Sequence, residues 1–469
     1  MMRLTISKNN IVLIYYNFFA LIVVLLIQFV SERNTWINIS FIIYLSSLVI
    51  NVLYLAHINN GVINFFNIFY VLTWAFHLSQ IYLGIGDGNE WDNLFSSYPI
   101  ELCKKAFTFS YVCIHFMVIG YLFSNEKKIT YCNKGIKINQ FDRFFIKYAF
   151  IFLYVIKILI KINQIRVSSV EGYLGALKEN TSFSVMLCTA AEIFSVLYLL
   201  HCCKNKNVLC VFLVLMELIF MLTGGRIYSV IYIAMLVLFV LTPDFRKYRD
   251  QQKTKVKNNK FLRIIAILVI FVFSIIMVNA VRVLRGSGFV DIFSILSTMN
   301  GSNIIYDMCK ELGFTQVDTV VAIENIKEIP YLHGSSYINS ICTILPNIGG
   351  LFSDTIRNFY FIYELQKYRF LNYGGSIVAE AFMNFSYAGC LLFFPIGIFI
   401  QKINSKIKNI DLLDMEWQIF IIAICFRLIS WTRGYFFAIV RIPIWLVLIY
   451  LLFRMFLCRS DKHNSIERT

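Results

Sequence analysis

Residues 372–389 read N-Y-G-G-S-I-V-A-E-A-F-M-N-F-S-Y-A-G, and this stretch decides how we interpret the rest of the chain. Its first part ends a long polar segment, and its second part opens an apolar run that continues to residue 400. Glu380 lies about one helical turn inside that run. A carboxylate in a membrane is costly and normally has a functional role or a partner. The stretch therefore predicts a membrane-spanning helix that begins beside a functional site.

The composition indicates that most of the chain is surrounded by lipid. Of 469 residues, 58% are apolar and 15% are charged, and the mean hydropathy is +0.68. A soluble protein of this composition could not cover its surface with polar groups. Crossing the hydrocarbon layer takes about 20 apolar residues, and about twelve runs approach that length. They are residues 11–30, 37–56, 62–84, 106–124, 144–162, 184–202, 208–223, 227–243, 262–281, 376–400, 417–432 and 435–457.

These runs predict an all-α polytopic membrane protein. Backbone groups in lipid must find hydrogen-bond partners within their own segment, which leaves the helix as the form for each run. The first run, residues 11–30, lacks a small-residue cleavage site and is predicted to be a retained span rather than a signal peptide. We see no linker or repeat, so we expect one membrane domain over residues 1–469.

The basic residues predict the orientation in the membrane. The net charge is +16, and lysine and arginine are concentrated in alternate connections, above all in residues 246–260. By the positive-inside rule, these connections and both termini are cytoplasmic. The charge is therefore no indication of nucleic-acid binding. On the opposite side, residues 282–375 form one long extracytoplasmic loop with short helices, and a shorter outer loop is expected at 163–183.

Arginines on the outer side run against this charge bias and mark the candidate binding site. Arg441 is expected about 12 Å below the outer end of the last span, at about 1.5 Å per residue. Guanidinium groups that share one cavity suit a phosphate or pyrophosphate. The alternative is that each one extends to lipid headgroups or helix-end carbonyls. The candidates are Arg226, Arg282, Arg285, Arg433 and Arg441.

Two residues are candidates for acid–base chemistry. Glu380 could act as a general base, or it could hold an arginine in place, a pairing that would lower its pKa. His333 is the single histidine of the long loop, in P-Y-L-H-G-S-S-Y. Imidazole titrates in the range that suits a general base, although a lone histidine in a loop is commonly solvated and inert.

The other charged groups in the spans are expected to form ion pairs inside the bundle. Glu192 and Glu217 are the acidic members, although a proton-coupled transporter would use such residues too. Their candidate partners are Lys157, Arg427 and His115. No metal site or cofactor is predicted, because the 12 cysteines include no C-x-x-C pair and residues 86–92, G-D-G-N-E-W-D, read as a solvated acidic turn.

Two stretches resemble the bacterial oligosaccharide repeat-unit polymerases, the Wzy-type O-antigen and capsule polymerases. Residues 331–346, Y-L-H-G-S-S-Y-I-N-S-I-C-T-I-L-P, are similar to that family's aromatic-x-x-G-x-S-[FY] segment, which precedes an apolar run ending in proline. Residues 374–389 are similar to its S-x-x-x-E-x-[YF]-x-N-F-G-x-x-G pattern, and G-G-R at 224–226 also fits. The chain departs from the family at Ser386, where glycine is usual, and at Asn347, where arginine is common.

The resemblance implies a metal-independent glycosyltransferase in the bacterial cytoplasmic membrane, with no cofactor. Its substrates would be oligosaccharides on undecaprenyl pyrophosphate, and its product an O-antigen or a capsule. The arginines would stabilise the leaving pyrophosphate, and Glu380 or His333 would accept the proton of the attacking hydroxyl. A chain-length regulator protein would be a further partner.

Two other functions stay open at this point. A ligase would move finished glycan from the same lipid-linked donor to a different acceptor. A flippase or secondary transporter would be expected to show inverted halves, interrupted helices and charged groups near the midplane.

Overall fold

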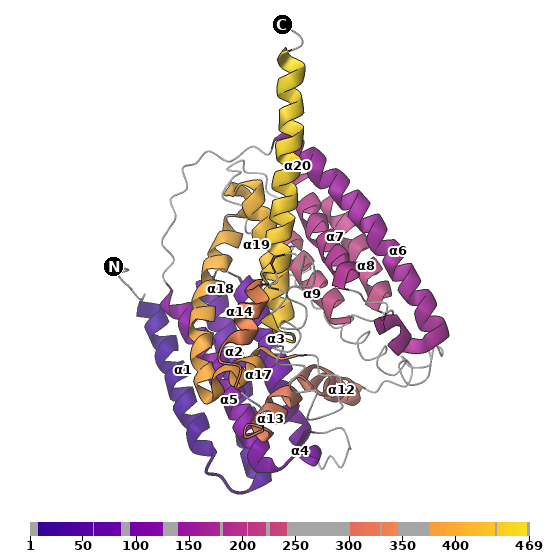
Figure 1. Ribbon diagram of the computed structural model, residues 1–469. Helices are drawn as coiled ribbons and strands as arrows, with labels where there is room; N and C mark the ends of the chain where they lie inside the picture. The colour runs from indigo at the N-terminus through magenta and orange to yellow at the C-terminus, as the bar shows by residue number, and fades with distance from the viewer. Residues whose placement is uncertain are drawn as a thin grey trace. The chain divides into compact units, whose positions relative to one another are not determined.

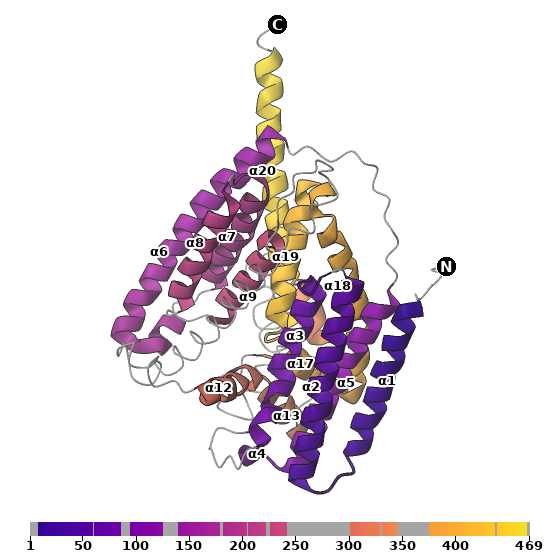
Figure 2. The same ribbon diagram turned by 180° about the vertical axis from the view of Figure 1, so that it is seen from behind.

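The computed structural model describes residues 8–59, 61–85, 94–124, 139–178, 182–203, 205–221, 226–241, 301–328, 331–342, 344–345, 375–436 and 439–466. Within these ranges every regular element is helical and no strand occurs, as the all-α prediction requires (Figures 1 and 2). Five helical stretches among these residues are long and apolar enough to cross a membrane. They are Asn10–Ile27, Arg33–Ile58, Ile100–Phe123, Phe183–His201 and Ile377–Lys408.

The expected runs coincide with helices wherever the structure describes them, but two helices have bounds that differ from those of the runs. Helix α6 (Gln140–Lys178) continues through most of the outer loop expected at 163–183, because no proline interrupts its sequence. Helix α20 (Arg441–Ile466) begins later than residue 435, and Pro443 lies in its first turn, where a missing N–H costs nothing. The count of about twelve spans stays a prediction, and the run 262–281 lies outside the described residues.

The chain divides into two compact units. The first comprises Met1–Thr130, Gly301–Ile407 and Arg427–Arg441, and the second comprises Tyr131–Asn300, Lys408–Phe426 and Ile442–Thr469. Helix α19 (Met415–Trp431) contributes residues to both units. This division into units does not test the expectation of a single membrane domain, which stays a prediction.

The first unit is built around α5 (Ile100–Phe123), most of whose side chains are buried. Helix α5 contacts elements from both halves of the chain, including α1, α3 and α13. The other elements of the unit are α1 (Lys8–Ile27), α2 (Arg33–Ile58), α3 (Phe65–Leu78), η1 (Ser79–Gly84), α4 (Leu94–Ser97), α12 (Gly301–Gly313), α13 (Gln316–Glu324), α14 (Ser335–Cys342), α17 (Ile377–Phe385), η6 (Ser386–Leu392) and α18 (Phe393–Lys408).

Two glycines bring α5 and α18 into backbone contact. A Cβ atom on Gly120 would collide with the carbonyl oxygen of Phe394, and one on Gly397 would collide with that of Met117. Small residues permit this close approach, a common device of helix packing in membranes. The apolar run that continues from residues 372–389 to residue 400 is thereby held against the centre of the first unit.

The second unit contains the middle of the chain. Its helices are α6, α7 (Ser182–His201), α8 (Lys206–Phe220), α9 (Arg226–Leu236) with a π-helical end at Val237–Leu241, η7 (Ile410–Leu412), and parts of α19 and α20. The hydroxyl of Tyr450 on α20 donates to Asp142 Oδ1 on α6 at 2.7 Å. His201 and Gln418 join α7 to α19 with a hydrogen bond of 2.6 Å.

Candidate functional site

The two stretches that carry the family resemblance lie against each other in the first unit. Residues 331–334 form a turn that leads into α14, and this turn is bound to the end of α17 (Figure 1). The Leu332 N–H donates to the carbonyl oxygen of Met383 at 3.0 Å. The Gly334 N–H donates to Asn384 Oδ1 at 2.8 Å. Gly334 has a φ of 85°, a conformation that favours glycine.

Glu380 is the centre of this contact. Ser376 caps α17 by accepting a hydrogen bond from the Ala379 N–H at 3.0 Å, which fixes the turn that carries Glu380. The Glu380 side chain is 1% exposed. Its Oε1 accepts from Ser336 Oγ at 2.9 Å. Its Oε2 accepts from Trp431 Nε1 at 3.1 Å and from the Phe436 N–H at 2.9 Å.

Asn384 completes the network one turn further along α17. Its Nδ2 donates to Ser336 Oγ and to the carbonyl oxygen of Glu380, each at 2.8 Å. Ser336 therefore accepts from one α17 side chain and donates to another. Because these atoms are buried, each unmade hydrogen bond would cost free energy. The network thus fixes α14 on α17 in one register.

Aromatic rings surround the carboxylate. Tyr337 on α14 stacks with Phe385, with ring centroids 6.3 Å apart, and meets Phe436 edge-on at 5.3 Å. Trp431, a donor to Glu380, contacts Phe436 at 5.1 Å. Large rings exclude water and so strengthen the hydrogen bonds to the carboxylate.

Arg433 lies between the two residues of segment 431–436 that bind Glu380. Its guanidinium pairs with Glu311 on α12, with Nη2 3.9 Å from Oε1, and lies 5.8 Å from the centroid of the Phe76 ring. His77 Nε2 donates to the carbonyl oxygen of the preceding residue, Thr432, at 3.0 Å. The structure thus brings the segment of one predicted arginine to Glu380. Among the described residues, however, the partners of Glu380 are neutral donors, and its pairing with an arginine stays a prediction.

Asp318 on α13 belongs to the same region and was missed by the sequence interpretation. Burial raises its pKa to about 7, although the Arg433 charge and the Gly375 backbone lower it. Gly375 has a φ of 93°, and a Cβ there would lie 2.9 Å from the backbone of Gly434. A carboxylate inside the apolar run V-D-T-V-V was the signal that could have identified Asp318.

The other predicted site residues have different outcomes. His333 lies in the turn before α14 at a φ of 47°, exposed, with its ring centroid 6.1 Å from that of Tyr331. Arg441 is the first residue of α20 and half-buried, and the depth expected for it within a span stays a prediction. Arg226 begins α9 in the second unit, but its side chain is not among those that the structure describes. Arg282 and Arg285 lie outside the described residues. A shared arginine cavity stays a prediction.

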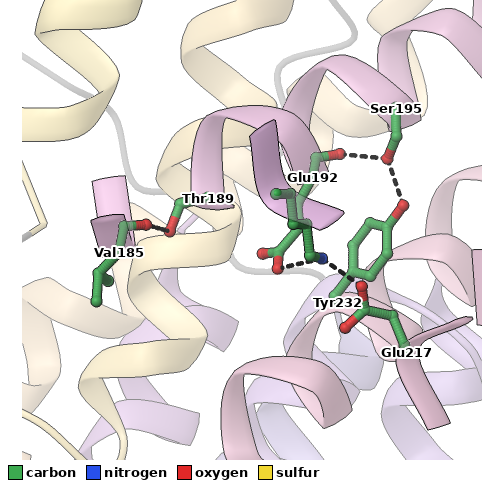
Figure 3. A network of polar contacts seen from close by, with 7 residues as sticks. Val185, Thr189, Glu192, Ser195, Glu217 and Tyr232 are labelled. Atoms are coloured by element: carbon green, nitrogen blue, oxygen red, sulfur yellow. Dashed lines mark hydrogen bonds and ion pairs between the residues drawn. The ribbon is translucent and has the colours of Figure 1, made fainter. Parts of the chain in front are cut away.

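A second polar cluster occupies the interior of the second unit (Figure 3). Lys157 Nζ donates to Glu192 Oε1 at 2.9 Å and also to Glu217 Oε1. The ammonium lies 4.7 Å from the centroid of the Tyr232 ring, whose hydroxyl bonds to Ser195. Of the three candidate partners, Lys157, Arg427 and His115, it is Lys157 that forms ion pairs with both glutamates. In the described part of the chain, no group of three or more His, Cys, Asp or Glu residues could hold a metal ion.

Comparison with known proteins agrees with the resemblance. The sequence model of the family described as "O-antigen polysaccharide polymerase Wzy" matches residues 15–462, nearly the whole chain. No curated protein and no solved structure gives a significant match.

Proposed function

We propose that this chain, which belongs to the O-antigen polysaccharide polymerase Wzy family, joins lipid-linked oligosaccharide repeat units into a surface polysaccharide. The donor is a growing glycan on undecaprenyl pyrophosphate, and the acceptor is a single lipid-linked repeat unit. A hydroxyl of the acceptor sugar attacks the anomeric carbon of the donor. The new glycosidic bond forms as the bond to the lipid pyrophosphate breaks, and the hydroxyl proton passes to a base. We place this reaction at the outer face of the cytoplasmic membrane.

The observation that carries the proposal is the junction of the two family-like stretches at Glu380. Ser336 from residues 331–346 and Asn384 from residues 374–389 bind each other, and Glu380 accepts from Ser336. A buried network of this kind needs every member to be satisfied. The network joins the two family-like stretches into one structural unit.

Within this proposal, Glu380 is a positioning residue. Its carboxylate is 1% exposed and already accepts from three donors, so it would have to give up a hydrogen bond to meet a substrate hydroxyl. The exposed His333, in the turn that Asn384 holds through Gly334, is then the proton acceptor. Arg433, with the predicted arginines Arg226, Arg282, Arg285 and Arg441, stabilises the leaving pyrophosphate.

The proposal is tested with purified protein in vesicles that contain a lipid-linked repeat unit, with product length read on a gel. The native protein is expected to give a ladder of polymers and to release lipid pyrophosphate. His333→Ala is expected to lose at least tenfold in rate without a change in unfolding temperature, because its side chain is exposed and general-base catalysis contributes about 100-fold or more. Glu32→Gln, a change of an exposed carboxylate between α1 and α2, is the matched control.

The same assay separates the rival functions. Transfer of glycan to a different acceptor without chain growth would identify a ligase. Movement of intact lipid-linked units across the vesicle membrane, with no new glycosidic bond, would identify a flippase. Either result contradicts the proposed polymerase reaction.

A further inference from the structure

Helix α14 has a polar face that is buried and an apolar face that is exposed. Its buried residues are Ser336 and Ser340, each 1% exposed, whereas Ile338, Ile341 and Leu345 on and just after the helix are 60%, 52% and 61% exposed. A helix on the surface of a soluble protein turns its apolar stripe to the core and its polar face to water. The outward face of α14 is therefore suited to hydrocarbon rather than to water.

The partners of α14 place it at the level of a candidate membrane span. Ser336 binds Glu380, and Gly334 binds Asn384, which both lie in the first part of the apolar stretch Ile377–Lys408. At about 1.5 Å per residue, these two positions are about 5 and about 10 Å from the beginning of that stretch. If the stretch crosses the bilayer, α14 lies beside its outermost turns, within the hydrocarbon layer.

Part of the backbone of the turn before α14 has protein partners. The Leu332 and Gly334 N–H groups in this turn bond to α17, and Ser340 Oγ donates to the carbonyl oxygen of Ser336 at 2.6 Å. Non-helical backbone is tolerated at membrane depth only where protein partners satisfy it, and these two N–H groups have such partners.

Apolar side chains are also exposed at the end of α17 and on η6. The exposed fractions are 38% for Phe385 on α17 and 48% and 58% for Tyr387 and Leu391 on η6, and all three belong to the same candidate span. Figure 1 shows α14 next to α17. If lipid surrounds the candidate span, we expect lipid to cover the exposed apolar side chains beside it as well.

We propose that α14 and Leu345 are inserted into the bilayer, with lipid acyl chains covering Ile338, Ile341 and Leu345; the preceding turn, with the exposed His333, is not part of this lipid-covered surface. This replaces, for these residues, the expectation of a loop that lies wholly outside the membrane. The inference rests on the packing of α14 and on the span that begins at Ile377. It does not depend on the proposed polymerase reaction.

The test is photo-crosslinking of the full-length protein in phospholipid vesicles. A benzophenone amino acid is introduced at 338 or 341, and the adducts are identified by mass spectrometry. Position 391, exposed on the candidate span, is the reference for lipid contact, and position 34, exposed in the first turn of α2, is the reference for a helix end. We expect 338 and 341 to give phospholipid adducts in at least half the yield obtained at 391 and at least fivefold more than at 34.

Two results would overturn the proposal. Adducts of 338 and 341 mainly with peptides of this chain would show that another segment covers the face. A lipid yield as low as that at position 34 would show that the face meets water. The two probe positions lie on the exposed face, so a folding defect at one of them leaves the other to decide.

Discussion

Replacement of Ser336 by alanine tests the network at Glu380 most directly. The change removes one hydroxyl that donates to Glu380 Oε1 at 2.9 Å and accepts from Asn384 Nδ2 at 2.8 Å. Side-chain hydrogen bonds between membrane helices contribute about 0.6 kcal/mol on average and about 1.7 kcal/mol at most. Two such bonds are lost, so Ser336→Ala is expected to lower the free energy of unfolding by about 1 to 3 kcal/mol.

Ser340 provides a matched control on the same helix. It is equally buried, and its hydroxyl donates to the carbonyl oxygen of Ser336, a bond within the helix. Such bonds back to the preceding turn add little to helix stability, so loss of this bond in Ser340→Ala is expected to cost less than about 0.5 kcal/mol. Equilibrium unfolding in mixtures of mild detergent and dodecyl sulfate measures both variants.

A double-mutant cycle then isolates the contact itself. If Ser336 acts through Glu380, the effects of Ser336→Ala and Glu380→Gln should not add, and their coupling should be at least about 0.5 kcal/mol. Equal effects of the two serine variants, or strict additivity in the cycle, would refute the network as the element that joins α14 to α17.

Three further predictions follow from single features. Ser386 has a φ of 52°, which favours glycine, so Ser386→Gly is expected to raise the unfolding free energy by about 1 kcal/mol; no gain would remove the argument for backbone strain at this bend. Lys157→Met leaves Glu192 and Glu217 buried without their cation and is expected to destabilise the protein by about 3 to 5 kcal/mol, measured by denaturation; a loss under about 1 kcal/mol would contradict the cluster. The pKa of Asp318 rises from 3.8 to about 7 on folding, so its stabilising contribution is complete below pH 3.8 and falls by about 1.4 kcal/mol per pH unit up to about pH 7. Unfolding of Asp318→Asn across that range should lack this slope, and an unchanged slope would exclude Asp318 as its source.

The sequence was sufficient to predict the helices because lipid imposes a simple rule on them. An apolar run of the right length must pair its own backbone, so runs such as 106–124 and 184–202 correspond to α5 and α7. The ion pairs of Lys157 were predictable for a related reason, since a charge inside a bundle needs a partner. Glu380 could be singled out for the same reason, because a carboxylate inside a membrane is costly without a partner.

The partners of Glu380 could not be predicted in this way. Trp431 and Phe436 are distant in sequence, and one of them contributes a backbone N–H, which no side-chain pattern records. Helix α20 begins at Arg441 rather than at residue 435, although the apolar residues before Arg441 resemble the start of a helix. Tertiary contacts decided both points, and local hydropathy contains no information about them.

The meeting of α5 and α18 at Gly120 and Gly397 also limits how the protein can change. The atoms that touch there are main-chain atoms on both sides, so no compensating side-chain substitution can widen or narrow the gap. Helix α18 follows directly from the bend after α17. The close contact of α5 and α18 therefore also helps to fix the position of α17, which carries Glu380. We expect variants selected for a new sugar specificity to leave these two glycines in place.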